Sequence, residues 1–532
     1  MTAPVRPEWG ATWPDLPTFR ALARERRVVP VVRRLLADDV TPVGLYRRLA
    51  QGRLGTFVLE SAESDGTWGQ WSFVGVSARA ALTSAPDGSA SWWGDVPVSL
   101  PREGDVLEVL GASLAALHTE PVPGLPPLTS GFVGSLGWDV IHHWEPTLPR
   151  RAPAEHDQPD VSLVLIGDMV AVDHRDGSIW LIANAINGND TDDGVDEAHA
   201  DAVARLDAMV ERLVRPEPPT LGALDGGAPA PDVKQRTAHL EFTDAVRAAK
   251  QAIVDGEVFQ VVLSQRLDLD CPADPLDVYR VLRTINPSPY MYLLHLPGHE
   301  RHERPGEPGE PGERGEFHVV GSSPETLVKV AGRQVTSFPI AGSRPRGDTP
   351  AHDKELAEEL LADPKERAEH LMLVDLARND LGRVCVPGTV AVVEFMEIKR
   401  FSHIMHMSST VAGELRPDAT ALQVLTSTFP AGTLSGAPKP RAIALIDELE
   451  PARRGVYGGV VGYFDLAGDM DTAIAIRTAV VADGRATVQA GAGLVADSDP
   501  ETEYVETRNK AAAVVRAIQV AATLTDPAAA RR

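Results

Sequence analysis

Three strand-like runs near the C-terminal end of the chain constrain its fold most strongly. They cover residues 458–464, 471–481 and 487–495 and are joined by Ala-Gly-Asp and Asp-Gly turns. Connections this short favour antiparallel neighbours, whereas parallel strands need a long crossover. We therefore predict an antiparallel meander within an α+β (mixed α/β) architecture, in which helices flank antiparallel sheets.

The last of these runs leads into a stretch, residues 488–510, whose components suit a binding site. Gly491-Ala492-Gly493 leaves backbone amides unobstructed, and Glu503, Glu506 and Lys510 follow on a helix that Ser498-Asp499-Pro500 begins and caps. This combination suits a small anionic ligand held partly through a metal ion. Taken alone, Glu506 and Lys510 also have the spacing and order of an ordinary ion pair on a helix surface.

The length of 532 residues exceeds what one hydrophobic core usually supports. A Pro-, Gly- and Ala-rich segment, RPEPPTLGALDGGAPAPDVKQ, interrupts both helix and strand periodicity at residues 215–235. We predict an N-terminal domain over residues 1–214, a linker over 215–235 and a second domain over 236–525.

Charge and apolar content exclude several classes of protein. The net charge is -24, from 51 basic and 75 acidic residues, which opposes binding to nucleic acid or anionic lipid. There is no apolar run of the roughly 20 residues needed to span a bilayer, and nothing at the N-terminus marks the chain for secretion. We expect a cytoplasmic protein, with Cys271 and Cys385 as buried thiols.

Several further elements are predicted from periodicity and end signals. Thr243 is read as the cap of a helix that ends at Gly256, and Asp363 as the cap of another helix in which Glu366 completes a capping box. Strands are expected at 56–59, 161–172, 258–267, 290–296 and 317–320, a helix at about 193–214, and a solvated hairpin loop at 298–316.

Individual polar residues each allow two interpretations. Glu369 follows the capped helix start within an apolar run, which predicts a mostly buried helix and either a metal ligand or an ion pair. Glu369 and Glu506, if they meet, would suit magnesium. Arg477 is predicted on one strand face with Ala473, Ala475 and Ala479, where it would bind a ligand carboxylate, pair with a protein carboxylate or face water.

Other candidates are weaker when each is considered alone. Gly342-Ser343 and Thr433 offer amides or hydroxyls with little obstruction, but glycine turns are common. His406 lies in FSHIMHM, where it is either a core histidine or an acid or base near neutral pH.

Together, these motifs resemble the chorismate-utilising enzymes, and most closely the large subunits of anthranilate synthases (component I). The strings that carry the resemblance are GSSPETLV, PIAGSRPRG, EHLMLVDLARNDLGRV, FSHIMHM, TFPAGTLSGAPK, GVYGGVVGYF, AIAIRTAVV and QAGAGLVADSDPETEYVETRNK. They occur in order over most of residues 243–518. The resemblance implies a two-domain fold and a magnesium-dependent lyase that converts chorismate and ammonia to anthranilate and pyruvate in tryptophan biosynthesis.

The resemblance also implies roles for residues of this chain. Glu369 and Glu506 are expected to bind Mg²⁺. The residues expected to surround the substrate are Gly342, Ser343, Thr433, Tyr457, Arg477, Gly491, Ala492, Gly493 and Lys510. Arg477, Lys510 and the metal would supply the local positive charge that an acidic chain needs for a dianionic substrate.

Two residues are expected to carry out the proton transfers. Glu325 resembles the acid that assists departure of the substrate hydroxyl, and His406 the histidine linked to pyruvate elimination. The alternative for Glu325 is a turn carboxylate after a proline. Ser343 departs from the usual threonine, which puts fine positioning in doubt.

Two positions help to choose among the relatives. Ala341 and Gln260 stand where other enzymes of the family carry lysines. Because both lysines are missing, ammonia addition followed by elimination is favoured. An aminodeoxychorismate or aminodeoxyisochorismate synthase stays open as an alternative.

A regulatory site and a partner are also implied. Leu59-Glu60-Ser61 and the segment 286–291 resemble tryptophan-binding elements, with Ser61, Pro289, Tyr290 and Met291 near the effector. Without the resemblance they read as a strand end and a proline turn. No Gly-x-Cys-x-Gly motif is present, so a separate glutaminase subunit, in a heterotetramer, would release ammonia. A non-catalytic tryptophan-binding regulatory subunit is a further alternative.

Overall fold

The computed structural model describes residue 5 and residues 7–62, 69–217, 220–224, 231–300, 314–400 and 404–525. The α-helices are α1 Leu16–Ala23, α2 Pro42–Leu49, α3 Val106–Ala116, α4 Val195–Val214, α5 His239–Val254, α6 Pro275–Ile285, α7 Pro350–Ala362, α8 Pro364–Gly382, α9 Ala421–Thr428, α10 Lys439–Leu449 and α11 Pro500–Ala521. A 3-10 helix covers Trp138–His143.

The strands lie between these helices, in several places as runs of consecutive strands. They are β1 Thr12–Trp13, β2 Val28–Leu36, β3 Thr56–Glu60, β4 Trp71–Ser84, β5 Ala90–Gly94, β6 Gly131–Leu136, β7 Val161–Asp173, β8 Ser178–Ile186, β9 Ala223–Leu224, β10 Val233–Gln235, β11 Gln260–Asp270, β12 Tyr290–Glu300, β13 Arg314–Ser323, β14 Thr326–Ala331, β15 Gln334–Ser337, β16 Ile340–Pro345, β17 Ala391–Arg400, β18 Ile404–Glu414, β19 Gly436–Ala437, β20 Val460–Asp465, β21 Met470–Ile474, β22 Thr478–Ala482, β23 Arg485–Leu494 and β24 Leu524–Thr525.

All strand pairings within the described residues are antiparallel. One ladder runs in the order β4, β3, β12, β13, β22, β23 and β11. A second runs from β7 through β6, β20, β21, β14 and β15 to β18. The predicted α+β class with antiparallel sheets is confirmed.

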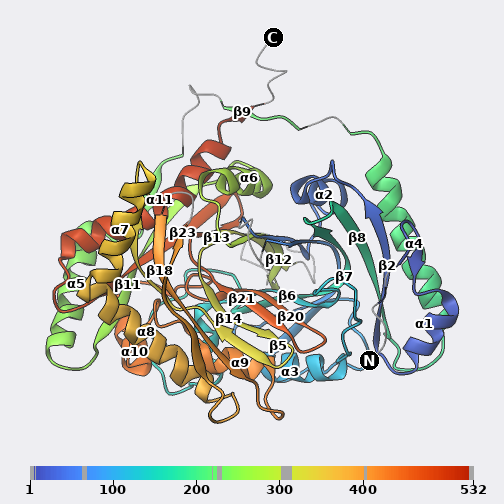
Figure 1. Ribbon diagram of the computed structural model, residues 1–532, viewed down its shortest axis with the longest axis horizontal. Coiled ribbons are helices and arrows are strands. Elements are labelled where there is room, and N and C mark those ends of the chain that lie inside the picture. Colours follow the sequence, from blue (N-terminus) through green and yellow to red (C-terminus); the bar gives the residue numbers. More distant parts are fainter. Residues whose placement is uncertain are drawn as a thin grey trace, which may run out of the picture.

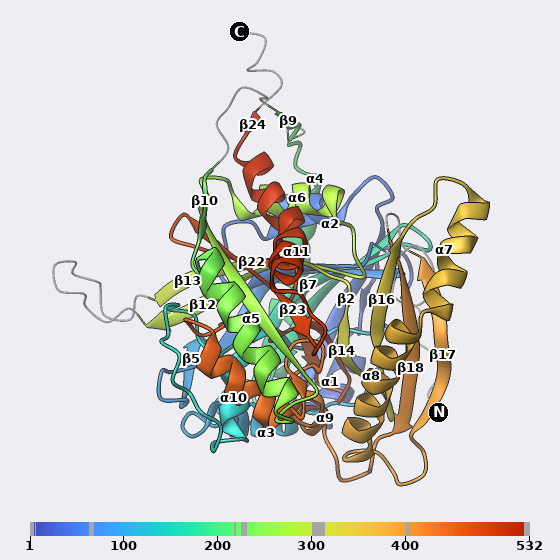
Figure 2. The same cartoon turned by 90° about the vertical axis from the view of Figure 1, so that its left-hand side faces the viewer.

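Helices cover the sheet from two sides. Helices α1 and α4 lie at one end of the molecule, whereas α5, α7, α8, α10 and α11 gather at the other (Figure 1). Seen from that second side, α5 and α11 lie over β11 and β23, and α8 lies beside β16 and β18 (Figure 2). No helix in the described part of the chain combines the length and apolar character needed to cross a membrane.

Strands from the N-terminal part pair directly with strands from the C-terminal part. Strand β3 pairs with β12, and β6 pairs with β20. Within the predicted linker, β9 pairs with β24 and β10 with β11. The proposed boundary at residues 215–235 stays a prediction.

Most of the predicted helix ends are confirmed. Asp363 accepts hydrogen bonds from the backbone N–H of Lys365 and Glu366, and Asp499 caps α11 through the N–H of Thr502. The α5 helix ends before Gly256, whose φ of +81° is the left-handed conformation that glycine adopts without strain.

The prediction for Thr243 is wrong. Helix α5 begins at His239, where the Glu241 carboxylate accepts from the N–H of Ala238 at 3.0 Å, so the helix starts one turn earlier. Thr243 is buried inside the helix and donates to the carbonyl of Leu240. An alanine at the cap position concealed this start.

The single strand predicted over 471–481 is also wrong. It is two strands: β21 pairs with β14 and β20, while β22 pairs with β13 and β23. Arg477, between them, has a φ of +52°, a conformation incompatible with extended strand. The chain therefore passes from one ladder to the other here, and Arg477 does not share a regular strand face with the alanines.

Strands β12 and β13 form the predicted hairpin but extend into the predicted loop; residues 301–313 of that loop lie outside the described part. Cys271 and Cys385 are buried free thiols, as predicted.

Candidate active site

Glu325 lies in the turn between β13 and β14, and its carboxylate accepts a hydrogen bond from the Thr433 hydroxyl at 2.8 Å. Burial raises the pKa of Glu325 to about 7, while Thr433, Lys510 and Arg477 oppose that shift. The two cations are therefore near this carboxyl. A carboxyl with this pKa is protonated in a large fraction of molecules at neutral pH and can donate a proton.

His406 lies on β18 opposite Ser343 of β16. Its Nδ1 is 3.1 Å from the carbonyl oxygen of Gly342; because that oxygen only accepts, Nδ1 is the donor. Burial lowers the pKa of His406, and Arg477 lowers it further. The imidazole is therefore neutral at pH 7, with its tautomer set by Gly342.

Arg477 joins this group from the irregular segment between β21 and β22. Its Nη1 donates to the carbonyl oxygen of Lys510 at 2.5 Å. The Lys510 ammonium in turn donates to the carbonyl of Gly491 at 3.1 Å. Burial lowers the pKa of Arg477, and Tyr457, Glu506 and Glu325 oppose that shift. A guanidinium partly removed from water in this way is suited to a ligand carboxylate.

The glycine-rich end of β23 allows close approach. A Cβ on Gly491 would lie 2.7 Å from the Tyr457 hydroxyl oxygen, and one on Gly493 would lie 2.7 Å from Nε2 of Gln260. Ala492 is buried between them. Gly342, with a φ of +69°, would place a Cβ 2.9 Å from Oε2 of Glu366. Larger side chains would displace the neighbours that shape the site.

Four glutamates from α8 and α11 influence one another here: Glu366, Glu369, Glu503 and Glu506. Burial raises the pKa of Glu369, and Glu366 and Glu506 raise it further, whereas Lys365 and Lys510 oppose this. Burial also raises the pKa of Glu503, and the charge of Glu506 raises it further. Such mutual repulsion indicates a place that a cation would stabilise.

The donor set fits a hard divalent cation, because carboxylate oxygens are the ligands that magnesium prefers. Among the described residues, no three His, Cys, Asp or Glu side chains are already gathered to hold a metal ion. Glu506 instead pairs with the Lys510 ammonium at 2.7 Å, which is the ordinary ion pair that the helix spacing predicts. The metal roles of Glu369 and Glu506 stay predictions.

Sequence reasoning gave Glu366 only a structural role, and it named Glu503 among the charged groups of a possible anion site but not as a metal ligand. Each lies three residues before a predicted ligand on the same helix, and this i, i+3 spacing was the available signal. The expectation of a mostly buried α8 was wrong, since Leu371 is 47% exposed. Glu369 is consequently half-buried rather than enclosed.

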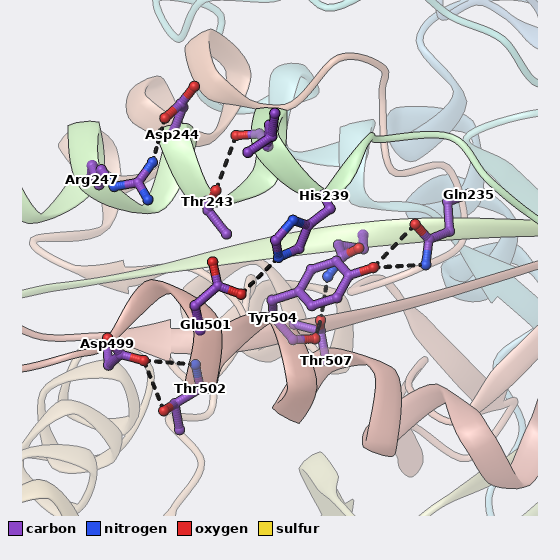
Figure 3. A network of polar contacts seen from close by, with 12 residues as sticks. Gln235, His239, Thr243, Asp244, Arg247, Asp499, Glu501, Thr502, Tyr504 and Thr507 are labelled. Atoms are coloured by element: carbon purple, nitrogen blue, oxygen red, sulfur yellow. Dashed lines mark hydrogen bonds and ion pairs between the residues drawn. The ribbon is translucent and has the colours of Figure 1, made fainter.

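Helix α11 is fixed at the end that carries Glu503 and Glu506. Figure 3 shows its first turns held by side chains from β10 and α5. The Tyr504 hydroxyl bonds the Gln235 side chain at 2.9 Å, and Glu501 lies 2.7 Å from Nε2 of His239. Farther along, Thr507 accepts from the buried amide of Gln265 at 2.6 Å.

The predicted effector residues line a different cavity, of about 820 Å³. Ser61 borders it after β3, and Pro289, Tyr290 and Met291 border it at the start of β12. Trp71, Phe73 and Trp180 contribute aromatic surface, while Arg34, Arg175, Lys329, Asp173 and Asp471 contribute charge. Aromatic walls with charges of both signs suit an aromatic zwitterion.

The two groups of residues are thus distinct. Glu325, Arg477, Tyr457, Gly491, Lys510 and Glu506 are linked by hydrogen bonds, by an ion pair or by their effects on one another's pKa. His406, Gly342 and Ser343 join them through β16 and β18. A small cavity of about 50 Å³ lies against Glu325 and Thr433.

The chain belongs to the chorismate binding enzyme family, whose model matches residues 62–516. Curated relatives that it matches include anthranilate synthase component 1 proteins. That of Arthrobacter globiformis is 53% identical over 517 residues, which cover 97% of this chain and 94% of that protein. That of Mycobacterium tuberculosis H37Rv is 52% identical over 516 residues, covering 96% and 97%.

Solved structures agree with this assignment. Anthranilate synthase component I from Streptococcus pneumoniae is 34% identical, has a TM-score of 0.72, and the match covers 90% of this chain and 98% of that one. The menaquinone-specific isochorismate synthase MenF from Escherichia coli, at 18% identity and a TM-score of 0.66, shares the fold.

Proposed function

We propose that this chain is the large subunit of an anthranilate synthase, which converts chorismate and ammonia to anthranilate, pyruvate and water. The observation that carries the proposal is the protonatable Glu325 carboxyl beside Arg477 and Lys510, in a chain 53% identical to an anthranilate synthase component 1. The reaction needs a proton donor and positive charge together, and this group of residues has both.

The first half of the reaction assigns a role to Glu325. Ammonia adds to the ring of chorismate while the ring hydroxyl leaves, and a proton from Glu325 converts that hydroxyl to water. The Thr433 hydroxyl, at 2.8 Å, holds the carboxyl in one orientation. Because burial raises its pKa to about 7, Glu325 keeps the proton it must donate.

The second half releases pyruvate and forms the aromatic ring. A ring proton must be lost as the bond to the pyruvyl oxygen breaks, and neutral His406 can accept a proton. Burial lowers its pKa, so the imidazole is unprotonated before this step. The contact with the Gly342 carbonyl fixes its orientation throughout.

Arg477, Lys510 and the amides of Gly491 to Gly493 are proposed to bind the substrate carboxylates, with Ser343, Thr433 and Tyr457 around the ring. Magnesium would be held by Glu369 and Glu506, with Glu366 and Glu503 beside them. When bound, the ion supplies positive charge for a substrate carboxylate. In its presence Lys510 would be released from its ion pair with Glu506 and could turn to the substrate.

Regulation and partnership complete the proposal. Tryptophan is proposed to inhibit by occupying the cavity lined by Ser61, Pro289, Tyr290 and Met291, whose aromatic and charged walls suit it. A glutaminase subunit, in a cytoplasmic heterotetramer, is proposed to supply the ammonia. The component 1 designation of the relatives supports a partner subunit.

The decisive experiment incubates the full chain with chorismate, ammonium and Mg²⁺ and identifies the product by mass and fluorescence. Anthranilate is expected; an aminodeoxychorismate or aminodeoxyisochorismate product would replace the proposed reaction, and tryptophan binding without turnover would indicate a regulatory subunit.

Glu506→Gln is expected to abolish turnover and to weaken Mg²⁺ binding measured by calorimetry. Glu448→Gln, an exposed glutamate on α10, is the matched control.

A further inference from the structure

The effector cavity and the catalytic group are joined by one short segment, residues 322–326, which comprises the end of β13, the two-residue turn and the first residue of β14. Glu325 belongs to this turn. The segment at residues 286–291, whose last three residues border the cavity, contacts both ends of residues 322–326. Two separate hydrogen-bond routes cross between them, one through Ser322 and one through Thr326.

Ser322 is fully buried and is the first of these links. Its hydroxyl donates to the carbonyl oxygen of Asn286 and accepts from Nδ2 of Asn286 at 2.8 Å. It also lies 3.0 Å from the Ser288 hydroxyl. On its other side, the N–H of Ser322 donates to the carbonyl oxygen of Arg477 at 3.2 Å. Ser322 thus connects the effector segment to the backbone of the guanidinium residue.

Thr326 forms the second link, next to Glu325. Its hydroxyl donates to the hydroxyl oxygen of Tyr290 at 3.0 Å, and Tyr290 donates to the Asp471 carboxylate at 2.8 Å. Asp471 also pairs with Lys329 at 3.3 Å, and Tyr290, Asp471 and Lys329 all border the cavity. A ligand that contacts Tyr290 or Asp471 therefore competes for the same atoms that orient Thr326.

The N-terminal wall of the cavity is tied to the same segment. The N–H of Ala62 donates to the carbonyl oxygen of Ser288 at 3.0 Å, and Glu60 is the register partner of Met291. Met291 in turn is the register partner of Ser322. Both cavity walls are thereby connected, by hydrogen bonds and strand pairing, to the turn that carries Glu325.

We propose that Ser322 and Thr326 are positioning residues that couple occupancy of the cavity to the placement of Arg477 and Glu325. The inference rests on the proposed function, because it takes chorismate as the substrate and tryptophan as the effector. A ligand shifts a conformational equilibrium only through its different affinity for the two states. Here that difference would arise at Tyr290, which borders the cavity, and would reach Ser322 through Ser288, which precedes the lining residues Pro289 and Tyr290.

The test compares Ser322→Ala and Thr326→Val with the wild type in the full chain, using chorismate, ammonium and Mg²⁺ with and without tryptophan. Ser322→Ala should mainly raise KM, because Arg477 binds substrate, and Thr326→Val should mainly lower kcat, because Glu325 donates the proton. In each variant the factor by which saturating tryptophan raises the KM for chorismate should fall about fivefold, which corresponds to one neutral hydrogen bond. Calorimetry should show tryptophan still bound with wild-type affinity.

Matched controls separate this effect from general loss of packing. Ser162 and Thr472 are buried hydroxyl residues, bonded to the carbonyls of Pro297 and Val328. Ser162→Ala and Thr472→Val should keep full inhibition. Thr326→Ser, which retains the hydroxyl, should restore it. If Ser322→Ala does not fold, the pair Thr326→Val and Thr326→Ser decides.

Inhibition unchanged in both test variants would overturn the coupling, as would an equal loss in the two controls. A wild-type chain that makes anthranilate without binding tryptophan would overturn it too, while leaving the proposed reaction intact. If no anthranilate forms, calorimetric titration of tryptophan with and without chorismate still measures the coupling, because linkage between two ligands is reciprocal.

Discussion

At the scale of single residues, the surroundings of Glu325 in a short turn determine the pKa of its carboxyl group. A polar side chain in this position gains little from water and has one hydroxyl, that of Thr433, as its hydrogen-bond partner. The nearby cations Arg477 and Lys510 favour the carboxylate, but burial outweighs them and raises the pKa to about 7. Both turnover and the free energy of unfolding should consequently change with pH as Glu325 loses its proton.

Glu325→Gln should therefore change both properties in opposite directions. Turnover of the wild type should fall as the pH rises through about 7, where the acid loses its proton, and the glutamine variant should be nearly inactive at every pH. Because the folded pKa lies above the unfolded one, the wild type loses stability as the pH rises from about 4.5 to 7. The variant avoids this loss.

Measured by denaturant unfolding, the variant should be more stable than the wild type at pH 8 by up to about 3 kcal/mol, and equally stable at pH 4. Glu448→Gln should show no such pH-dependent difference. Equal stability of Glu325→Gln and wild type at pH 8 would mean that the buried carboxylate carries no cost.

At the scale of secondary-structure elements, α11 determines where the C-terminal charged groups lie. Its start is capped by Asp499 and tied to β10 and α5, so Glu503, Glu506 and Lys510 project from a fixed helix. Loosening the first turn would spread these groups and weaken any site that needs them together.

Asp499→Ala should remove the cap and cost about 1 kcal/mol in the free energy of unfolding. Magnesium affinity, measured by calorimetry, should fall as well, because Glu503 lies in the first turn. Asp499→Asn retains a side-chain acceptor for the N–H of Thr502 and should be close to wild type. An equal loss in the asparagine variant would assign the effect to charge instead of capping.

The elements also show which signals the sequence carries. Asp363 and Asp499 are local signals, since an acidic residue before a proline suffices to predict a cap, and both were confirmed. The start of α5 was missed because its cap position holds an alanine, Ala238, whose backbone N–H donates to the Glu241 carboxylate. The break at Arg477 was missed because it is produced by pairing with strands distant in sequence, and no local preference reveals it.

The same distinction applies to the candidate site. The glycines and paired charges of β23 and α11 were visible in sequence as an anion site. Their relation to Glu325 was supplied by family resemblance and depends on packing between segments far apart in the chain. The influence of Glu366 and Glu503 on Glu369 could have been suspected from helix spacing, but only the fold puts α8 and α11 within electrostatic reach.

At the scale of the whole molecule, the pairing of β3 with β12 joins the predicted N-terminal domain to the predicted second domain. Strands β6 and β20 provide a second such junction. Buried strand pairs of this kind are held by many backbone hydrogen bonds and by apolar contacts between the side chains of the two strands. The N-terminal part is consequently held to the rest by more than the covalent connection.

A protease site inserted at residues 225–230, in the Pro- and Gly-rich segment, tests this arrangement. After cleavage the two fragments should elute together in gel filtration and should keep anthranilate formation from chorismate and ammonium. The uncleaved insertion protein is the control for the insertion itself. Separation of the fragments without denaturant would show that the two parts are independent bodies.

The position of Met291 between Glu60 on one side and Ser322 on the other has an evolutionary consequence. A slip of one residue in either pairing would turn every following side chain of β12 to the opposite face of the sheet. The register of β12 is therefore fixed on both sides at once, so that a one-residue insertion or deletion near Met291 would disturb its pairing with β3 and with β13 together.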